Sequence, residues 1–187
     1  MRIIGITGFS AAGKSMIVDY FRTRYNFPVI RTGDSVRQYI RDKGIPLSAN
    51  ACTALSNKFR RNKKSLGELA KERLLELRES GTECVVIDAL RGKYDLDFYR
   101  QFSEEIITIG IFSSPQQRFA RMLKRSREGD YTNYEDFRKA DDWQFNFGVG
   151  KLFAFADYMI VAQDRTMEEM YEETDRIIKK IMKQNGK

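Results

Sequence analysis

The chain has 187 residues, 42% of them hydrophobic, and a formal net charge of +7. This length suits one well-packed domain and is too short for two large ones. No run approaches the ~20 apolar residues that span a bilayer, and the start of the chain does not have the pattern of a signal peptide. We therefore expect a soluble cytoplasmic protein without a membrane partner. The positive charge favours anionic partners, namely phosphates, nucleotides or nucleic acid, without choosing among them.

Histidine is absent, and the two cysteines, Cys52 and Cys84, lie far apart without a metal-ligand pattern. This composition argues against a disulfide framework, a zinc site and any nucleophilic mechanism that depends on histidine. The chemistry must therefore depend on carboxylates, lysines, arginines and a bound metal.

Short apolar runs alternate with segments of helical period along the whole chain, beginning with an apolar run that enters a glycine loop. In chain order, the predicted strands cover residues 2–7, 28–30, 84–87, 106–112 and 157–161. The predicted helices cover residues 14–25, 34–43, a long segment ending near residue 81, a segment after residue 115, and residues 166–182. The intervening helices indicate that the strands are parallel and covered on both faces.

This order predicts an α/β fold, a three-layer α/β/α sandwich around a five-stranded parallel sheet, in a single domain over residues 1–187. Two polar stretches depart from the alternation and are expected to lie over the strand ends, where ligands bind in open α/β sheets. We predict a helical insertion at about 34–81 and a lid at about 126–150. The core then consists of residues 1–33, 82–125 and 151–187.

The segment from Gly8 to Ser15 matches the phosphate-loop pattern G-x-x-x-x-G-K-[ST] and lies between a predicted strand and a predicted helix. Its amides are expected to hold ATP phosphates, with Lys14 on the β and γ phosphates and Ser15 on Mg²⁺. The alternative is an ordinary glycine turn. The predicted ATP-binding residues are Gly8, Phe9, Ser10, Ala11, Ala12, Gly13, Lys14, Ser15 and Met16.

Asp88 ends the third predicted strand, where an acidic residue completes the metal site in such folds. We assign it to Mg²⁺, through water, and to catalysis together with Lys14. The alternative is that Asp88 caps the segment that follows the strand.

The second predicted strand leads into Arg31-Thr32-Gly33-Asp34-Ser35-Val36-Arg37, which resembles the T-G-D-x-x-R segment of adenylate kinase. The resemblance implies that Thr32 and Arg37 hold the phosphate or base of the acceptor. Arg91, shortly after Asp88, resembles the acceptor arginine of nucleoside monophosphate kinases. Asp34 is the carboxylate placed to assist an acceptor hydroxyl. The alternative is that Thr32 or Asp34 caps a helix and Arg37 is solvated.

Three arginines at spacings of three and four, Arg118, Arg121 and Arg125, share one face of the helix that leads to the lid. Kinases of this class use such arginines to neutralise the transferring phosphoryl group. Arg121 and Arg125 lie nearer the lid and are our catalytic candidates. The alternative is a solvated basic helix face.

Nearly the whole chain resembles a P-loop nucleoside monophosphate kinase-like protein, most closely an archaeal group related to adenylate kinase. Its last strand and helix resemble those of dephospho-coenzyme A kinases. Lids of this group carry R-D-x-R before a W-G turn, whereas residues 140–144 read Ala-Asp-Asp-Trp-Gln here. The departure implies that transition-state charge is stabilised differently or weakly.

These features predict an enzyme that uses ATP and Mg²⁺ to phosphorylate a nucleoside monophosphate or a similar phosphorylated metabolite. Three alternatives stay open. They are hydroxyl phosphorylation like that of dephospho-coenzyme A kinase, an ATPase or switch acting with a protein or RNA partner, and nucleic-acid binding through the basic stretch at 58–64. The absence of N-K-x-D favours ATP over GTP.

Overall fold

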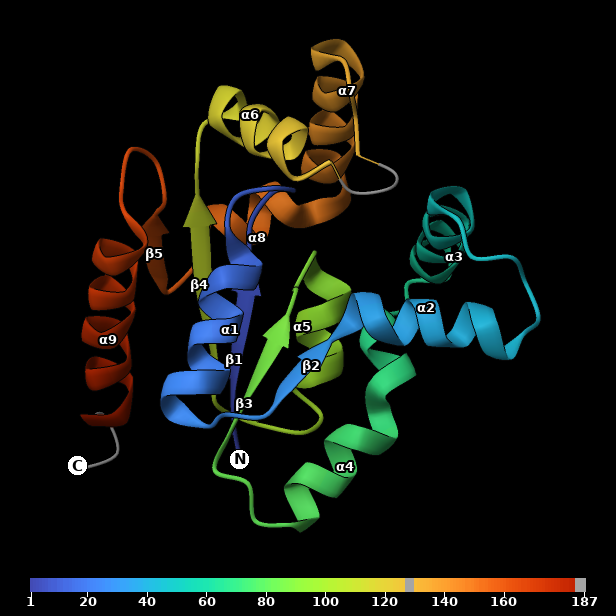
Figure 1. Cartoon of the computed structure of the whole chain (residues 1–187). Coiled ribbons are helices and arrows are strands. Elements are labelled where there is room, and N and C mark those ends of the chain that lie inside the picture. Colours follow the sequence, from blue (N-terminus) through green and yellow to red (C-terminus); the bar gives the residue numbers. More distant parts are fainter. Residues whose placement is uncertain (127–129, 184–187) are drawn as a thin grey trace.

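The computed structural model describes residues 1–126 and 130–183 (Figure 1). Its five-stranded sheet has the order β2-β3-β1-β4-β5, and every strand pair is parallel. The strands are β1 (Arg2–Thr7), β2 (Val29–Arg31), β3 (Cys84–Asp88), β4 (Ile106–Phe112) and β5 (Tyr158–Val161). The sheet and its helices confirm the predicted α/β/α fold.

Helices connect the strands and cover both faces of the sheet. Those before β3 are α1 (Lys14–Tyr25), α2 (Thr32–Asp42), α3 (Ala49–Arg61), the 3₁₀ turn η1 (Leu66–Ala70) and α4 (Lys71–Glu79). Those after it are α5 (Lys93–Tyr99), α6 (Pro115–Arg125), α7 (Tyr134–Gln144), the π-turn η2 (Phe145–Val149), α8 (Gly150–Ala154) and α9 (Met167–Lys183). None of the helices within the described ranges is long and apolar enough to cross a membrane.

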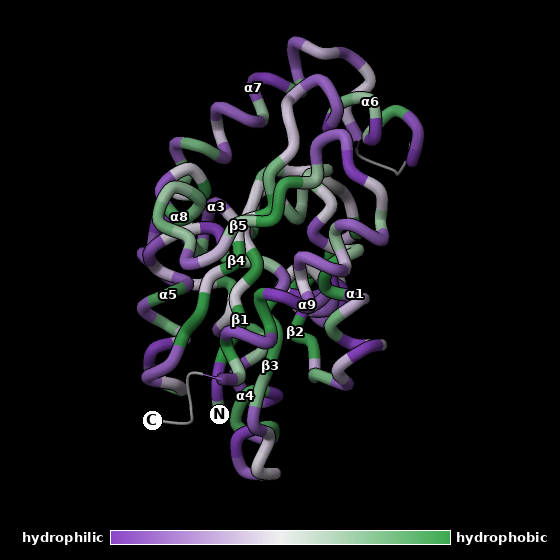
Figure 2. The backbone as a smooth tube through the Cα atoms, turned by 90° about the vertical axis from the view of Figure 1, so that its left-hand side faces the viewer, coloured by the Kyte–Doolittle hydropathy of each residue, from purple (hydrophilic) through white to green (hydrophobic). Residues whose placement is uncertain are grey.

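The central strand β1 is buried along its whole length because apolar layers lie on both of its faces. On one face, Ile4 and Ile6 belong to a cluster with residues of α1 and α9. On the other face, Ile3 belongs to a cluster with residues of α4, α5 and α8. Figure 2 shows the apolar strands running between the helical layers. Each fully buried isoleucine contributes about 1.5–3 kcal/mol, so this alternation stabilises the three-layer arrangement.

The strand register brings the carboxyl ends of β1 and β3 close to one level, and β4 extends two residues beyond the end of β1. Ile6 of β1 is opposite Asp88 of β3 on one side and Ile109 of β4 on the other. The segments that follow β1, β3 and β4 therefore meet at the same edge of the sheet, where ligands bind in open α/β folds.

The prediction of one long helix that ends near residue 81 is wrong about its continuity. The segment is divided into α3, η1 and α4, because the backbone turns at Lys63 (φ 56°) and the Ser65 hydroxyl then accepts a hydrogen bond from the N–H of Gly67, 2.9 Å. Helix α2 begins at Thr32, slightly earlier than expected. It packs against α3 and η1 through Val36 and Ile40.

The segment predicted as a lid contains α7 and η2. Helix α7 begins after Asn133, whose side chain accepts a hydrogen bond from the N–H of Asp136, 2.8 Å. This is the N-cap arrangement that stabilises a first helical turn. Residues 127–129 of the predicted lid lie outside the described residues.

Candidate functional site

The loop from Gly8 to Ser15, called the P-loop below, bends through three residues with positive φ. These are Gly8 (138°), Ala11 (61°) and Gly13 (104°). A Cβ at Gly8 would lie 2.6 Å from the carbonyl oxygen of Ile111 in β4. Only glycine therefore fits at Gly8, which lets the loop turn tightly over β4 before α1 begins.

Replacing Gly8 with alanine is expected to lower the free energy of unfolding by about 1–3 kcal/mol and to weaken nucleotide binding, because backbone strain and a backbone clash coincide. Gly44 provides a matched control, since it also has positive φ (65°) but no atom within 4 Å of an added Cβ. Thermal unfolding of Gly8→Ala and Gly44→Ala measures the difference. Equal losses in the two variants would contradict the close approach at Gly8.

Lys14, the first residue of α1, folds back over the P-loop. Its Nζ donates hydrogen bonds to the carbonyl oxygens of Gly8 and Phe9, both 2.8 Å away. Burial, reinforced by the positive charge of Arg91 and partly opposed by Asp88, lowers the pKa of Lys14 to about 7. Among the described residues no carboxylate forms an ion pair with Lys14, so a bound phosphate would supply the compensating anion.

A pocket of about 760 Å³ joins the P-loop to the ends of β2 and β3 and to α6. Most of the predicted site residues line it. They are Ser10, Ala11, Ala12, Gly13, Lys14, Ser15, Met16, Thr32, Arg37, Asp88, Arg91, Arg121 and Arg125.

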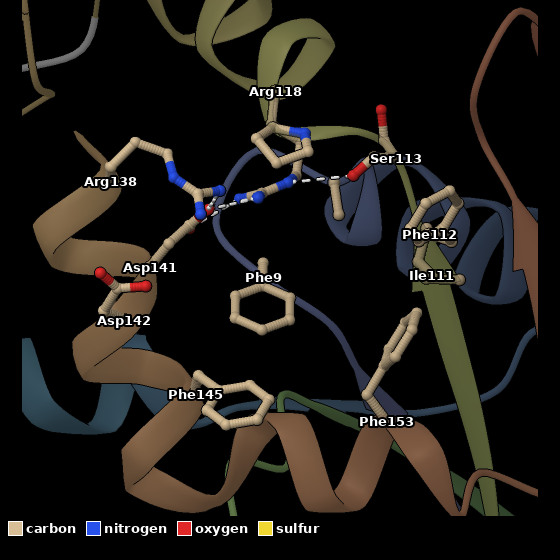
Figure 3. A pocket seen from close by; sticks show the side chains of 12 residues that line it. Phe9, Ile111, Phe112, Ser113, Arg118, Arg138, Asp141, Asp142, Phe145 and Phe153 are labelled. Carbon is tan, nitrogen blue, oxygen red and sulfur yellow. Dashed lines mark hydrogen bonds and ion pairs between the residues drawn. The ribbon is translucent and has the colours of Figure 1, made fainter. Parts of the chain in front are cut away.

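Three predicted site residues are placed elsewhere. Gly8 lies beneath the loop against β4. The ring of Phe9 faces a second cavity, of about 220 Å³, on the other side of the loop (Figure 3). The carboxylate of Asp34 accepts a hydrogen bond from Arg37 and lines a separate groove between α2 and α4. Asp34 therefore does not line the P-loop pocket, although its partner Arg37 does.

Asp88 projects from the end of β3 into the pocket, and its side chain is 14% exposed. Arg31 lies 3.7 Å from its carboxylate and also pairs with Asp19 at 2.6 Å. Sequence reasoning missed Asp19 and Arg31. The available signal was that Asp19 lies one helical turn after Ser15, on the same face of α1.

Ser15, Asp19 and Asp88 are the oxygen donors in this pocket that suit Mg²⁺. Within residues 1–126 and 130–183, no group of three or more histidine, cysteine, aspartate or glutamate side chains is clustered to hold a metal ion. A site with few protein ligands fits Mg²⁺, because this ion keeps several waters and binds the phosphates of its substrate.

Arg121 and Arg125 enter the pocket from α6. Arg121 donates to the carbonyl oxygens of Ala12 (3.4 Å) and Ala162 (2.5 Å), which joins the P-loop to the segment after β5. Arg125 makes two hydrogen bonds to the carboxylate of Asp130, at 2.7 and 2.6 Å.

Arg118, the third arginine of this face, is 3% exposed and forms a two-pronged ion pair with the buried carboxylate of Asp141 in α7 (Figure 3). It also donates to the carbonyl oxygens of Ser10 (3.2 Å) and Ser113 (3.1 Å). Arg118 thus joins α6, α7 and the P-loop.

A contact between α3 and the segment after α7 was also missed from the sequence. The guanidinium carbon of Arg60 lies 3.0 Å from the ring centre of Phe147, which packs against Trp143. The basic stretch at 58–64 therefore directs one arginine inward. No short-range pattern marks this contact, because its partners are more than 80 positions apart.

The AAA domain family matches residues 7–138 of the chain. A UPF0200 protein from Methanocaldococcus jannaschii is 30% identical over 97% of this chain and 91% of its own length. One from Thermococcus kodakarensis is 33% identical over 96% of this chain and 98% of its own.

Solved structures share the fold at low identity. A shikimate kinase from Bacteroides thetaiotaomicron is 16% identical, with a TM-score of 0.58 over 95% of this chain and 98% of its own. The protein TT1252 from Thermus thermophilus is 19% identical, with a TM-score of 0.63 over 98% of this chain and 97% of its own. The more specific resemblance to adenylate kinase depends on the T-G-D-x-x-R segment alone. The chain belongs to the UPF0200 family and has a P-loop kinase-like fold.

Proposed function

We propose that this protein is a cytoplasmic kinase that transfers the γ-phosphoryl group of ATP to a small anionic acceptor, a nucleoside monophosphate or a similar phosphorylated metabolite. The observation that carries the proposal is the charge of the pocket next to the P-loop. Its cations are Lys14, Arg31, Arg37, Arg91, Arg121 and Arg125, against the lining carboxylates Asp19 and Asp88 and two carboxylates outside the lining, Asp34 and Asp130, which pair with Arg37 and Arg125. Such an excess suits two anionic substrates bound side by side.

At the donor end, the P-loop amides and Lys14 bind phosphate oxygens, while Arg121 and Arg125 approach from α6. Ser15 and Asp88 would hold Mg²⁺. When bound, this ion neutralises charge on the β and γ oxygens. The remaining contribution of the protein is positioning and fixed positive charge rather than covalent chemistry.

At the acceptor end, Thr32, Arg37 and Arg91 lie at the ends of β2 and β3. Thr32 donates to the carbonyl oxygen of Asp88 at 3.3 Å, which holds the start of α2 beside the metal-binding side of the pocket. A phosphate acceptor is already deprotonated and needs no general base. Asp34 does not line this pocket, so a hydroxyl acceptor would need Asp19 or Asp88 as its base, whereas a phosphate acceptor needs neither.

The shared fold of a shikimate kinase and of a gluconokinase from Sinorhizobium meliloti (16% identical, TM-score 0.54) supports a kinase of small molecules. It also keeps hydroxyl phosphorylation as the second candidate activity. In that case Asp88 or Asp19, the carboxylates of the pocket, takes the proton of the acceptor.

A coupled ADP-release screen over nucleoside monophosphates, dephospho-coenzyme A and simple phosphorylated metabolites tests the proposal, with Lys14→Ala as the negative control. Acceptor-dependent ADP release, with a phosphorylated product identified by mass spectrometry, supports it. ATP hydrolysis that stays independent of every acceptor overturns it.

An ATPase or switch that acts through a partner is favoured by one observation. Arg138 of α7 lies 3.8 Å from Asp141 and lines the cavity behind the P-loop, so the described part of the lid brings no arginine to the nucleotide pocket. Partner-dependent ATP hydrolysis without a phosphorylated small molecule would support this role. Nucleic-acid binding through residues 58–64 is disfavoured because Phe59 packs against the cluster around Val36 and Ile40.

A further inference from the structure

Gln144, the last residue of α7, joins the lid directly to the P-loop. Its side chain is 5% exposed, and its Oε1 accepts hydrogen bonds from both the N–H and the hydroxyl of Ser10, each 3.1 Å long. Its Nε2 donates to the carbonyl oxygen of Ala140 at 3.3 Å, within the same helix. Because α7 engages the amide nitrogen, the amide oxygen is the atom turned toward the loop.

Ser10 is also held from a second side. Arg118 donates to its carbonyl oxygen and pairs with Asp141, three residues before Gln144 on α7. Residues three apart share a helix face, so one face of α7 fixes both the N–H and the carbonyl group of Ser10. Figure 3 shows the Arg118–Asp141 pair above the ring of Phe9, the neighbour of Ser10. Since Ser10 lines the nucleotide pocket, the position of α7 sets the shape of one pocket wall.

The carboxamide suits this contact because it is neutral. A carboxylate in the same place could accept the same two hydrogen bonds, but it would repel a terminal phosphate. An alanine would make neither bond. A glutamine therefore keeps the lid docked on the loop without adding negative charge beside Lys14.

We propose that Gln144 is a positioning residue that docks the lid on Ser10 and thereby shapes the P-loop for the terminal phosphate of a nucleoside triphosphate. The proposal rests on the proposed function, because ATP is the ligand that it invokes. It goes further by assigning to the lid a residue that distinguishes a triphosphate from a diphosphate. Gln144 does this through Ser10, without contacting the nucleotide.

The test compares Gln144→Glu and Gln144→Ala with Asn133→Ala, which removes the N-cap of α7 at the far end of the helix. Titration calorimetry measures the affinities for Mg·ATP and Mg·ADP. The emission of Trp143, the sole tryptophan of the chain, reports the docking of α7.

At pH 8, Gln144→Glu is expected to weaken Mg·ATP binding by about tenfold more than Mg·ADP binding, because it adds a negative charge behind Ser10 of the P-loop, which repels the more highly charged nucleotide more strongly. Gln144→Ala should shift the emission of Trp143 and reduce the ratio of the affinity for Mg·ATP to that for Mg·ADP. Asn133→Ala should leave the preference unchanged.

An unchanged ATP-to-ADP preference in both Gln144 variants overturns the positioning role. If Gln144→Ala does not fold, the glutamate variant, which can still accept both bonds from Ser10, carries the test. A wild-type protein that gives no heat with Mg·ATP overturns the proposed function and this role together. Normal wild-type binding with unaffected variants overturns this role alone.

Discussion

Lys14→Ala is expected to abolish phosphoryl transfer, with a loss of about 10²–10³-fold or more, because it removes a preorganised cation from the P-loop. The alanine also frees the carbonyl oxygens of Gly8 and Phe9 to which Nζ donates. The ADP-release assay measures the change in turnover, and calorimetry with Mg·ATP measures the change in affinity. Near-normal turnover in this variant would refute the assigned role of the P-loop.

The lowered pKa of Lys14 adds a second readout. Its pKa of about 7 lies below the ordinary value of 10.5, so most of these amines are neutral in the free protein above pH 7. Phosphate oxygens favour the charged form and raise the pKa again. At pH 8 to 9, Mg·ATP binding should therefore take up about one proton. Calorimetry in buffers of different ionisation enthalpy measures this uptake, and Lys14→Arg should abolish it because arginine stays protonated.

In the free protein, the same shift makes stability depend on pH. A lysine whose pKa is lower in the folded state than in the unfolded state destabilises the fold fully below pH 7. This penalty is relieved as the pH rises from about 7 toward 10.5. The contribution of Lys14 to the free energy of unfolding therefore increases over that window, and Lys14→Met should remove this part of the pH dependence.

Asp141→Ala is expected to lower the free energy of unfolding by about 3–5 kcal/mol, because it leaves the charge of Arg118 buried without a partner. Both side chains are almost fully inaccessible to solvent. Arg118 would still donate to backbone carbonyls, but these do not neutralise its charge. Urea denaturation of the wild type and of Asp141→Ala measures the loss.

The double variant Arg118→Met/Asp141→Leu is the control for that prediction. Replacing a whole buried ion pair with apolar groups is often close to neutral, so the double variant should be more stable than Asp141→Ala. It should nevertheless bind Mg·ATP less well, since the carbonyl group of Ser10 loses its donor. A loss below about 1 kcal/mol in Asp141→Ala would place this pair among weak surface ion pairs instead.

The sheet could be predicted from the sequence because its strands are short, apolar and separated by helices of clear period. Strands β1 and β4 have the predicted bounds, and β5 begins one residue later than expected. The break between α3 and α4 was not predictable, since it depends on the left-handed backbone at Lys63 and on a serine cap.

Part of the candidate site could also be predicted, because its residues follow strand ends that must meet at one edge of a parallel sheet. This explains how Lys14, Asp88 and Arg91 reach one pocket. The prediction for Asp34 assumed a side-chain direction that a motif does not determine, and its carboxylate lines the groove between α2 and α4 instead. The contacts of Gln144 depend on how α7 folds back over the loop, so they join residues more than 130 positions apart.

The strand order has a consequence for how new specificities can arise. Backbone hydrogen bonds fix the spacing between β1 and its two neighbouring strands. The strand ends that carry the P-loop and Asp88 therefore keep their relative positions whatever helices follow β2. The sheet therefore keeps the phosphate-binding geometry constant, while the helical stretch between β2 and β3 can be exchanged. A chimera that takes the stretch between β2 and β3 from a kinase of the same architecture should accept a different molecule while keeping the triphosphate binding that we propose for this protein.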